Sequence, residues 1–233
     1  MVLLFWFTHC YGPSYSRGQV LLYRPGFSFV NSWVDLEGRF LMAEFSRRDS
    51  AFRIPSVYAP TRNPKRDKFF TSCVYFADPS VPTILCGDFN AVFDRAKDRR
   101  GSDPAVTVRE SFVSLGLLFR EFCVLDVWRH LHPDLHAYTG LNPDGSLYPR
   151  IDFIGFPSTW LHLVSSCSIV PRPFSDHDAV YLGFPIPESF PLGPGRWKVN
   201  VSILRDPVFF QTVSDFWPRW RSRKPSFSFL QDW

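Results

Sequence analysis

The residues best suited to chemistry follow a short apolar segment. Ile84 to Cys86 is typical of a buried strand, and a glycine, Asp88, Phe89 and Asn90 come directly after it. Because side chains alternate along extended chain, Asp88 and Asn90 are expected to point the same way while Phe89 enters the core. A carboxylate can move a proton or bind a metal, and an amide can donate to a phosphoryl oxygen. The pair suits a phosphate ester, although a plain turn explains it equally well.

Other polar residues stand at the ends of apolar segments. Asp152 lies in Arg150-Ile151-Asp152, Asp176 and His177 precede the last apolar segment, and Tyr58 ends another. Taken singly, they also fit an ion pair, a strand-entry cap, a loop histidine and a core aromatic residue. Together with Asn90 they supply the base, metal ligand and hydrogen-bond donors that phosphodiester hydrolysis requires.

Strands are expected to position these groups. Alternating or continuous apolar segments predict strands at residues 19–23, 27–34, 39–45, 52–58, 84–86, 150–155, 161–170 and 179–184. The opening segment, residues 1–7, is either a core strand or an abnormal start, and residues 124–128 and 137–139 are short strand or turn pieces. Residues 39–45 are apolar on both faces, which indicates a sheet covered on two sides.

Two helices are expected between the strands. The first begins with Asn63 as its cap and Pro64 after it, and its apolar face includes Phe69, Phe70, Cys73, Val74 and Ala77. The second follows the capping-box spacing of Thr107 and Glu110, with an apolar stripe of Val108, Phe112, Leu115 and Phe119. The pattern predicts an α/β sandwich of two sheets packed face to face with helices outside.

Charged segments flank these helices. Lys65, Arg66 and Lys68 lie in the first turn of the first helix, where cations oppose the helix dipole. A solvated face is the expected role, and contact with a phosphate is the alternative. The loop at residues 94–103 alternates acids with bases, and its charge is expected to keep it at the surface.

Composition limits the class of protein. The 233 residues include 18% aromatic residues, enough for a large core, and a net charge of +4 permits a polyanionic partner. The five cysteines are odd in number and widely spaced, which indicates reduced residues of an intracellular protein. No segment has the length of a signal peptide or a membrane span, so a soluble protein is expected.

The chain changes character near residue 185. Residues 1–184 are expected to form one domain, and residues 185–233 a proline-rich linker followed by a helix that begins at Asp206-Pro207. That helix has an apolar stripe of Phe209, Val213, Phe216, Trp217 and Trp220, broken by Pro218. The stripe is expected to dock on another region of a longer protein, with folding back onto the first domain as the alternative.

Four segments occur in a characteristic order: Tyr58-Ala59-Pro60, Gly87-Asp88-Phe89-Asn90, Arg150-Ile151-Asp152 and Ser175-Asp176-His177. In this order they resemble the endonuclease/exonuclease/phosphatase superfamily, and most closely the endonuclease domain at the N-terminus of LINE-type (non-LTR) retrotransposon polyproteins. The resemblance runs from about Gly18 to Phe184. Residues 193–200 also resemble the linker that precedes the reverse transcriptase in such polyproteins.

The resemblance implies a DNase-like four-layer fold and an enzyme that nicks DNA with Mg²⁺ or Mn²⁺. His177 would be the general base or contact the phosphate, oriented by Asp152. Asp88 would position the water or protonate the leaving oxygen. Asn90 and Tyr58 would hold the phosphate.

The resemblance also implies roles for positions around this group. Asp176 would assist the metal, and the substrate would be contacted by Thr139, Arg150, Thr61 and Ser175. Thr61 departs from the family because many relatives carry Asn there, and Gly140 stands where a tryptophan is common.

The front of the chain departs further. The family opens with a strand that carries an Asn and then a Gln-Glu pair, whose glutamate is the principal magnesium ligand, whereas residues 1–17 contain no acid. Because Mg²⁺ prefers carboxylate oxygens, the missing Glu is expected to weaken metal binding. We therefore expect a piece of a larger element, truncated at both ends and lacking the first strand or strands.

Two functions follow from this resemblance. The first is an impaired, retrotransposon-derived DNA endonuclease, monomeric, in the nucleus or cytoplasm, with DNA as substrate and the reverse-transcriptase region as neighbour. The alternative is a catalytically dead, nucleic-acid-binding or inert product of a decayed element. A phosphoinositide phosphatase is a weaker third possibility, which the linker resemblance disfavours.

Overall fold

The computed structural model describes residues 6–11, 18–23, 27–47, 50–101, 109–141, 145–173 and 175–185, together with five positions between 207 and 215. The chain divides into two compact units, residues 1–188 and residues 189–233. In the smaller unit Pro207, Val208, Gln211, Ser214 and Asp215 are described, and all of them are helical. Apart from Pro185, the predicted linker lies outside the described residues, and so does the predicted aromatic stripe.

The larger unit contains all the named strands and helices. Its strands are β1 (Trp6–Tyr11), β2 (Gly18–Tyr23), β3 (Ser28–Val34), β4 (Phe40–Arg47), β5 (Ser50–Tyr58), β6 (Leu85–Asp88), β7 (Arg99–Gly101), β8 (Val124–Asp126), β9 (Leu147–Pro149), β10 (Asp152–Pro157), β11 (Ser166–Val170) and β12 (Ala179–Gly183). Its α-helices are α1 (Asn63–Cys73), α2 (Arg109–Glu121) and α3 (Val127–Leu131), with short 3₁₀ turns η1 (Val74–Phe76) and η2 (Ser158–Leu163). None of the helices in this described part is long and apolar enough to cross a membrane.

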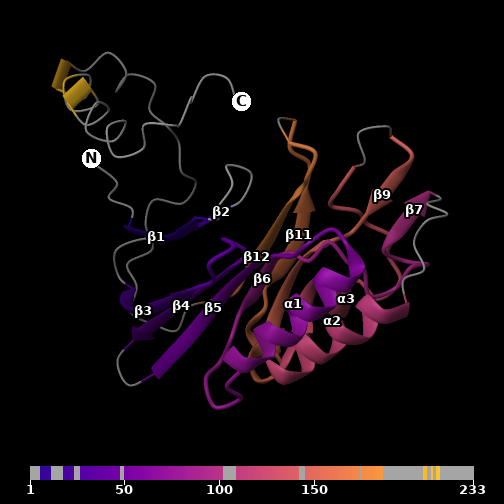
Figure 1. Ribbon diagram of the computed structural model, residues 1–233, viewed down its shortest axis with the longest axis horizontal. Helices are drawn as coiled ribbons and strands as arrows, with labels where there is room; N and C mark the ends of the chain where they lie inside the picture. The colour runs from indigo at the N-terminus through magenta and orange to yellow at the C-terminus, as the bar shows by residue number, and fades with distance from the viewer. Residues whose placement is uncertain are drawn as a thin grey trace. The chain divides into compact units, whose positions relative to one another are not determined.

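A six-stranded sheet in the order β3-β4-β5-β6-β10-β8 forms the centre of this unit. β5 and β6 are parallel, and the other neighbouring pairs are antiparallel. Three two-stranded sheets, β1-β2, β7-β9 and β11-β12, surround it. Figure 1 shows α1 and α2 side by side along the central sheet, and the contacts between the two helices agree.

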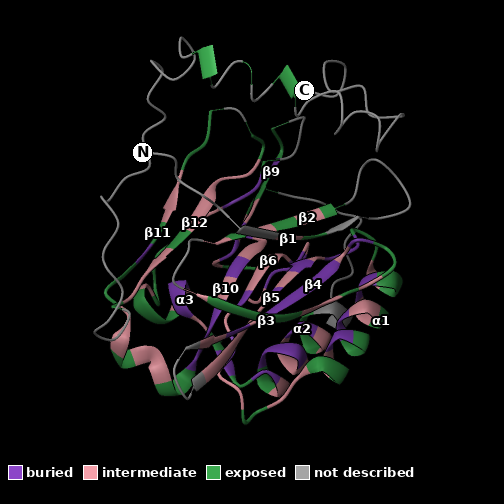
Figure 2. Ribbon diagram, turned by 90° about the vertical axis from the view of Figure 1, so that its left-hand side faces the viewer, coloured by how far each residue is buried: buried purple, intermediate pink, exposed green. Residues whose placement is uncertain are grey.

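Two apolar cores cover the two faces of the central sheet. One joins β4, β5, β6 and β10 to α1 and α2, and the other joins β10 to α3, β11 and β12. Within β10, Phe153 belongs to the first core and Phe156 to the second, because residues three apart in a strand face opposite sides. Figure 2 shows the buried positions in the middle of these layers. The predicted α/β sandwich with flanking helices is confirmed.

The early strands agree with the sequence patterns, whereas later ones differ in part. β4 is buried on both faces, as its double apolar pattern predicted. Residues 161–170 do not form one strand, since η2 occupies their first part and only Ser166–Val170 is extended. Residues 124–128 form β8 and the first turn of α3, and residues 137–139 are irregular.

The two long helices form where predicted, with different ends and faces. The N-cap of α1 is Arg62, without a side-chain cap, so the predicted capping role of Asn63 is wrong, although proline stands in the first turn. In α2, Phe112 is 49% exposed, and the buried positions among the side chains described from residue 112 onward are Leu115, Leu118 and Phe119. The predicted capping residue Thr107 lies outside the described residues.

Burial corrects the interpretation of two charged segments. Arg66 is buried, so it is not part of a solvated helix face. Asp98 is completely buried inside the loop that was expected to stay at the surface. Each has polar partners that compensate for the loss of water. The charge of Arg66 and Asp98 was therefore not sufficient to predict whether these residues lie in the interior or at the surface.

Candidate active site

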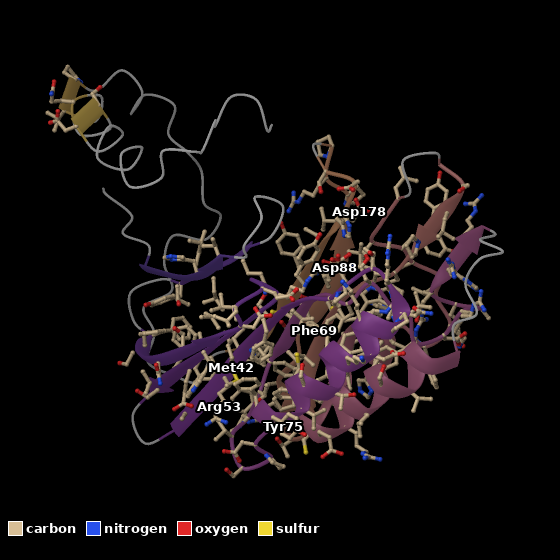
Figure 3. The ribbon with its side chains drawn as sticks, viewed as in Figure 1. Met42, Arg53, Phe69, Tyr75, Asp88 and Asp178 are labelled. Atoms are coloured by element: carbon tan, nitrogen blue, oxygen red, sulfur yellow. The ribbon has the colours of Figure 1, made fainter. Side chains whose placement is uncertain are left out.

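The ends of three neighbouring strands bring the predicted groups together. Tyr58 at the end of β5 lies opposite Asp88 at the end of β6, and Asp88 lies opposite Asp152 at the start of β10. Side chains directly opposite each other in a sheet lie on the same face. The sheet register thus aligns a phenol and two carboxylates in one row. Figure 3 shows Asp88 at the edge where the loop bearing Asp178 also lies.

The segment around Asp88 is fixed by close packing. Gly87 has φ of +133°, and a Cβ atom there would lie 2.0 Å from the carbonyl oxygen of Val57, so only glycine fits beside β5. Phe89 is completely buried, and its ring contacts Phe70, Phe119 and Phe153. The alternation predicted for this segment is confirmed: Phe89 anchors the turn in the core and Asp88 stays at the edge.

Asn90 binds Asp88 rather than open space. It adopts a left-handed conformation with φ of 48°. Its backbone N–H donates to Asp88 Oδ1 at 2.8 Å, and its side-chain amide donates to Asp88 Oδ2 and to the carbonyl of Ala59, each at 2.9 Å. Both amide hydrogens are used, which differs from the expected donation to a phosphate. Asn90 therefore orients the carboxylate of Asp88.

The side chain of Arg66 stabilises the turn at Asn90. The guanidinium donates to the carbonyl oxygens of Thr61 and Asn90 and to the side-chain oxygen of Asn63. It thereby joins the start of α1 to the Asn90 turn. Burial lowers the pKa of Arg66, and the nearby carboxylates of Asp67 and Asp88 oppose that shift.

His177 reaches the row from the loop before β12. Its Nδ1 atom lies 2.8 Å from Asp152 Oδ2, and its backbone N–H donates to the hydroxyl of Ser175 at 3.0 Å. The loop is tied down on both sides of His177, since Leu141 N–H donates to the carbonyl of Asp176 and Asp178 N–H to that of Thr139. The predicted orientation of His177 by Asp152 is present in the structure.

The carboxylates and the imidazole alter one another's protonation. Burial, followed by repulsion from Asp152, raises the pKa of Asp88 to about 6, while Asn90 and His177 oppose the shift. The hydrogen bond to Asp152 and the charges of Asp152, Asp88 and Asp176 raise the pKa of His177 to about 9, against desolvation. Near neutral pH, His177 is therefore a cation, and Asp88 can both hold and release a proton.

Two residues expected to contact substrate are buried instead. Thr139 is 1% exposed, and its hydroxyl accepts hydrogen bonds from the backbone N–H groups of Ile151 and Asp152, each at 3.0 Å. Arg150 is also 1% exposed. Neither side chain reaches the surface, so a substrate contact by either one conflicts with the structure. Thr139 acts on the backbone that carries Asp152.

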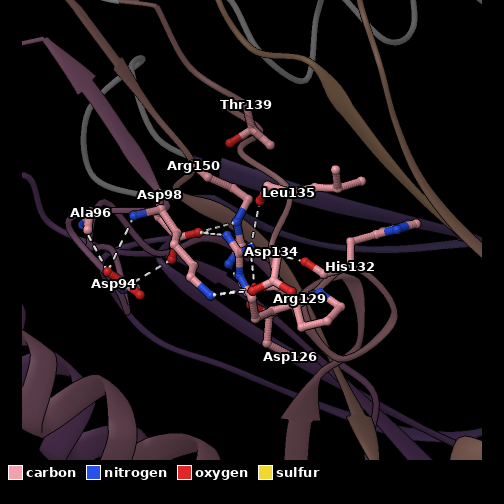
Figure 4. A network of polar contacts seen from close by, with 12 residues as sticks. Asp94, Ala96, Asp98, Asp126, Arg129, His132, Asp134, Leu135, Thr139 and Arg150 are labelled. Atoms are coloured by element: carbon pink, nitrogen blue, oxygen red, sulfur yellow. Dashed lines mark hydrogen bonds and ion pairs between the residues drawn. The ribbon is translucent and has the colours of Figure 1, made fainter.

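Arg150 belongs to a buried ionic network, which Figure 4 shows. Its Nε donates to Asp98 Oδ1 at 2.8 Å and its Nη2 to Asp126 Oδ2 at 2.6 Å. Arg129 Nη2 lies 2.5 Å from the same Asp98 oxygen. The Arg150 guanidinium also lies over the rings of Trp128 and Phe153. This network joins the loop at 94–98 to β8, α3 and the start of β10.

The other predicted site residues are exposed. Thr61, Ser175 and Asp176 are open to solvent, and Tyr58 is half-buried. The row also includes a residue that the sequence analysis missed, Arg39, whose guanidinium lies 5.3 Å from the centroid of the Tyr58 ring. The sequence feature that could have indicated Arg39 was its position directly before the strand β4.

The carboxylate oxygens at this edge have the chemistry that Mg²⁺ prefers. Asp88 and Asp152, however, already hold Asn90 and His177, and the described part of the chain contains no group of three or more acidic, histidine or cysteine residues arranged to hold a metal. These residues therefore do not by themselves form a complete metal site.

Solved structures with the same fold are nucleases and phosphatases. The Xenopus laevis APE2 catalytic domain matches with a TM-score of 0.62 and 16% identity, over 79% of this chain and 76% of that one. An AP endonuclease from Archaeoglobus fulgidus matches with a TM-score of 0.60 and 15% identity, over 77% and 80%. The 3′ phosphatase NExo from Neisseria, bound to a product DNA hairpin, matches with a TM-score of 0.57 and 20% identity, over 72% and 75%. The fold is that of the DNase I-like hydrolases.

Sequence comparison identifies the family. Residues 2–177 match the model of the Endonuclease/Exonuclease/phosphatase family. The "Transposon TX1 uncharacterized 149 kDa protein" of Xenopus laevis is 33% identical in an alignment of 226 residues that covers 94% of this chain. The chain spans 17% of the length of that protein. This protein belongs to the endonuclease/exonuclease/phosphatase family.

Proposed function

We propose that this chain is the DNA-nicking endonuclease domain of a retrotransposon-derived protein. The observation that carries the proposal is the row of Tyr58, Asp88 and Asp152, with His177 bonded to Asp152. A cation, a carboxyl group with a pKa of about 6 and a phenol on one face provide the groups that phosphodiester hydrolysis requires. The similarity to the TX1 transposon protein supports the retrotransposon origin.

Each residue has a defined task in this proposal. His177 is held by Asp152, and its raised pKa keeps it protonated. As a cation it contacts the phosphate and stabilises the charge that develops on the phosphate oxygens. A water molecule attacks phosphorus and releases a proton to bulk solvent, and as the bond from phosphorus to the leaving oxygen breaks, Asp88 donates its proton to that oxygen. The Asp88 carboxylate then takes up a proton from solvent. Tyr58 holds the phosphate from the β5 side. Asn90 keeps Asp88 in position.

We also propose Mg²⁺ or Mn²⁺ as the cofactor, with Asp176 as one ligand, because Asp176 is an exposed carboxylate next to His177. A bound divalent ion would neutralise charge on the phosphate.

The setting of the domain is part of the proposal. Residues 185–233 would lead from the nuclease to a reverse-transcriptase region, in a monomeric protein of the nucleus or cytoplasm. Limited proteolysis tests the boundary. Cleavage between Phe184 and Arg205 that leaves the nuclease domain intact is expected, and a tail as protected as residues 84–86 would contradict it.

Relaxation of supercoiled plasmid DNA tests the function. We expect conversion to open circles in Mg²⁺ and none in EDTA. Binding of DNA without cleavage would instead indicate the catalytically dead, nucleic-acid-binding alternative. Release of phosphate from a phosphoinositide, without plasmid nicking, would identify the third possibility.

A further inference from the structure

The row at the sheet edge has a fourth member. Tyr58 N–H donates to the carbonyl of Arg39 at 2.8 Å, which continues the pairing of Phe40 with Val57 by one step. Arg39 therefore lies opposite Tyr58, as Tyr58 lies opposite Asp88. Residues opposite each other share a face of the sheet. Arg39, Tyr58, Asp88 and Asp152 thus form one line across four neighbouring strands, with a cation at its end.

The Arg39 side chain is held in place and forms one long ion pair with an exposed carboxylate. Its Nη1 donates to the carbonyl of Tyr58 at 3.0 Å, and its guanidinium lies over the Tyr58 ring. Its Nε is buried, has no hydrogen-bond acceptor among the described residues and lies 3.6 Å from a carboxylate oxygen of Glu37, whose side chain is 63% exposed. An exposed carboxylate at this distance compensates little of the charge.

Arg53 provides an internal comparison on the same pair of strands. Its guanidinium also lies over an aromatic ring, that of Trp33, at 5.6 Å, and its side chain is 17% exposed against 13% for Arg39. Arg53, however, bonds to Glu44 at 2.7 Å and approaches Asp78 at 3.4 Å. Figure 3 shows Arg53 far along the sheet from Asp88. Of these two stacked arginines, the one beside the active site has the longer ion pair, and its carboxylate partner is the more exposed.

We propose that Arg39 binds a DNA phosphate next to the one that is hydrolysed. Neighbouring strands are ~4.8 Å apart, so Arg39 stands two strands, or roughly 10 Å, from Asp88, with Tyr58 between them. Arg39 thus stands one strand beyond Tyr58, the residue proposed to hold the reacting phosphate, which suits the next phosphate along the DNA strand. The Nη2 group of Arg39 makes no hydrogen bond to the described residues, and a planar guanidinium matches phosphate oxygens. This inference rests on the proposed DNA-nicking function.

The salt dependence of DNA binding tests this role. Fluorescence anisotropy with a fluorescein-labelled DNA duplex, in EDTA to prevent metal-dependent cleavage, gives the slope of log Kd against log salt concentration. For Arg39→Gln we expect about tenfold weaker binding and a slope smaller by about one, the value for one lost phosphate contact. Arg39→Lys keeps the charge and should keep the slope. Arg53→Gln is the matched control and should bind as the wild type does.

The outcomes separate this inference from the proposed function. If the wild type binds and nicks DNA but Arg39→Gln keeps the wild-type slope, only the role of Arg39 is overturned. An equal loss of slope in Arg53→Gln would also overturn it, because the effect would not depend on position. If the wild type neither binds nor nicks DNA, the proposed function fails and this inference fails with it. Thermal unfolding of each variant verifies that its fold is retained.

Discussion

Two clusters of charged residues lie around the start of β10, and they differ in how their charges are balanced. In the buried network, Asp98 and Asp126 are matched by Arg129 and Arg150 through bonds of 2.5 to 2.8 Å. In the active site, two carboxylates share one histidine, and Asp88 and His177 have pKa values of about 6 and about 9. Complete pairing makes the first cluster structural, and incomplete pairing makes the second chemically responsive.

The largest expected effect is on activity at the site. Asp152→Asn keeps the size of the side chain but removes the charge that holds His177 as an oriented cation. We expect nicking to fall by about a hundredfold or more. The apparent pKa of His177, followed by NMR, should fall in the same variant, and a pKa that stays at about 9 would contradict the assignment.

The network should respond in stability. Asp98→Ala removes the acceptor of both Arg129 and Arg150, and we expect a loss of about 3–5 kcal/mol in the free energy of unfolding. Asp134→Ala is the control, since Asp134 forms an exposed ion pair with Lys97 and should change stability by less than about 1 kcal/mol. Urea unfolding measures both. Equal losses would show that burial does not distinguish the two pairs.

Asp88 should show the opposite behaviour, because its environment disfavours the charged form. Its folded-state pKa of about 6 exceeds the ordinary value of 3.8, so its contribution to stability is complete below the ordinary value and is lost as pH rises through about 6. The free energy of unfolding of Asp88→Asn should therefore match that of the wild type near pH 4 and exceed it by on the order of 1–3 kcal/mol near pH 7. Thermal unfolding at both pH values measures this, and a pH-independent difference would contradict the raised pKa.

A smaller effect is expected between the two clusters, at Thr139. Thr139→Val removes the acceptor for the N–H groups of Ile151 and Asp152 and should cost about 2 kcal/mol of stability. Nicking should fall as well, since the backbone of Asp152 is less well fixed. Thr139→Ser retains the hydroxyl and should recover most of both losses. If serine performs no better than valine, the hydroxyl has no positioning role.

Local patterns were sufficient for the sandwich and for the Asp88 turn. Phe89 and Asp88 could be assigned to core and edge because strand alternation decides this within a few residues. Arg150 and Asp98 are 52 positions apart, and no local pattern indicates their pairing. The motif around Arg150 predicted a substrate contact, and the charged loop around Asp98 predicted solvent exposure. Both side chains are buried, so both predictions were wrong. The position of Arg39 beside Tyr58 likewise depends on strand register.

Plasmid nicking by two histidine variants tests the central claim most directly. His177→Ala should abolish nicking in Mg²⁺ while the variant keeps its fold, because His177 is held at the site by Asp152 and belongs to neither apolar core. His162→Ala alters an exposed histidine in η2, beyond the far end of β10, and should nick DNA at the wild-type rate. Near-normal nicking by His177→Ala would contradict the account.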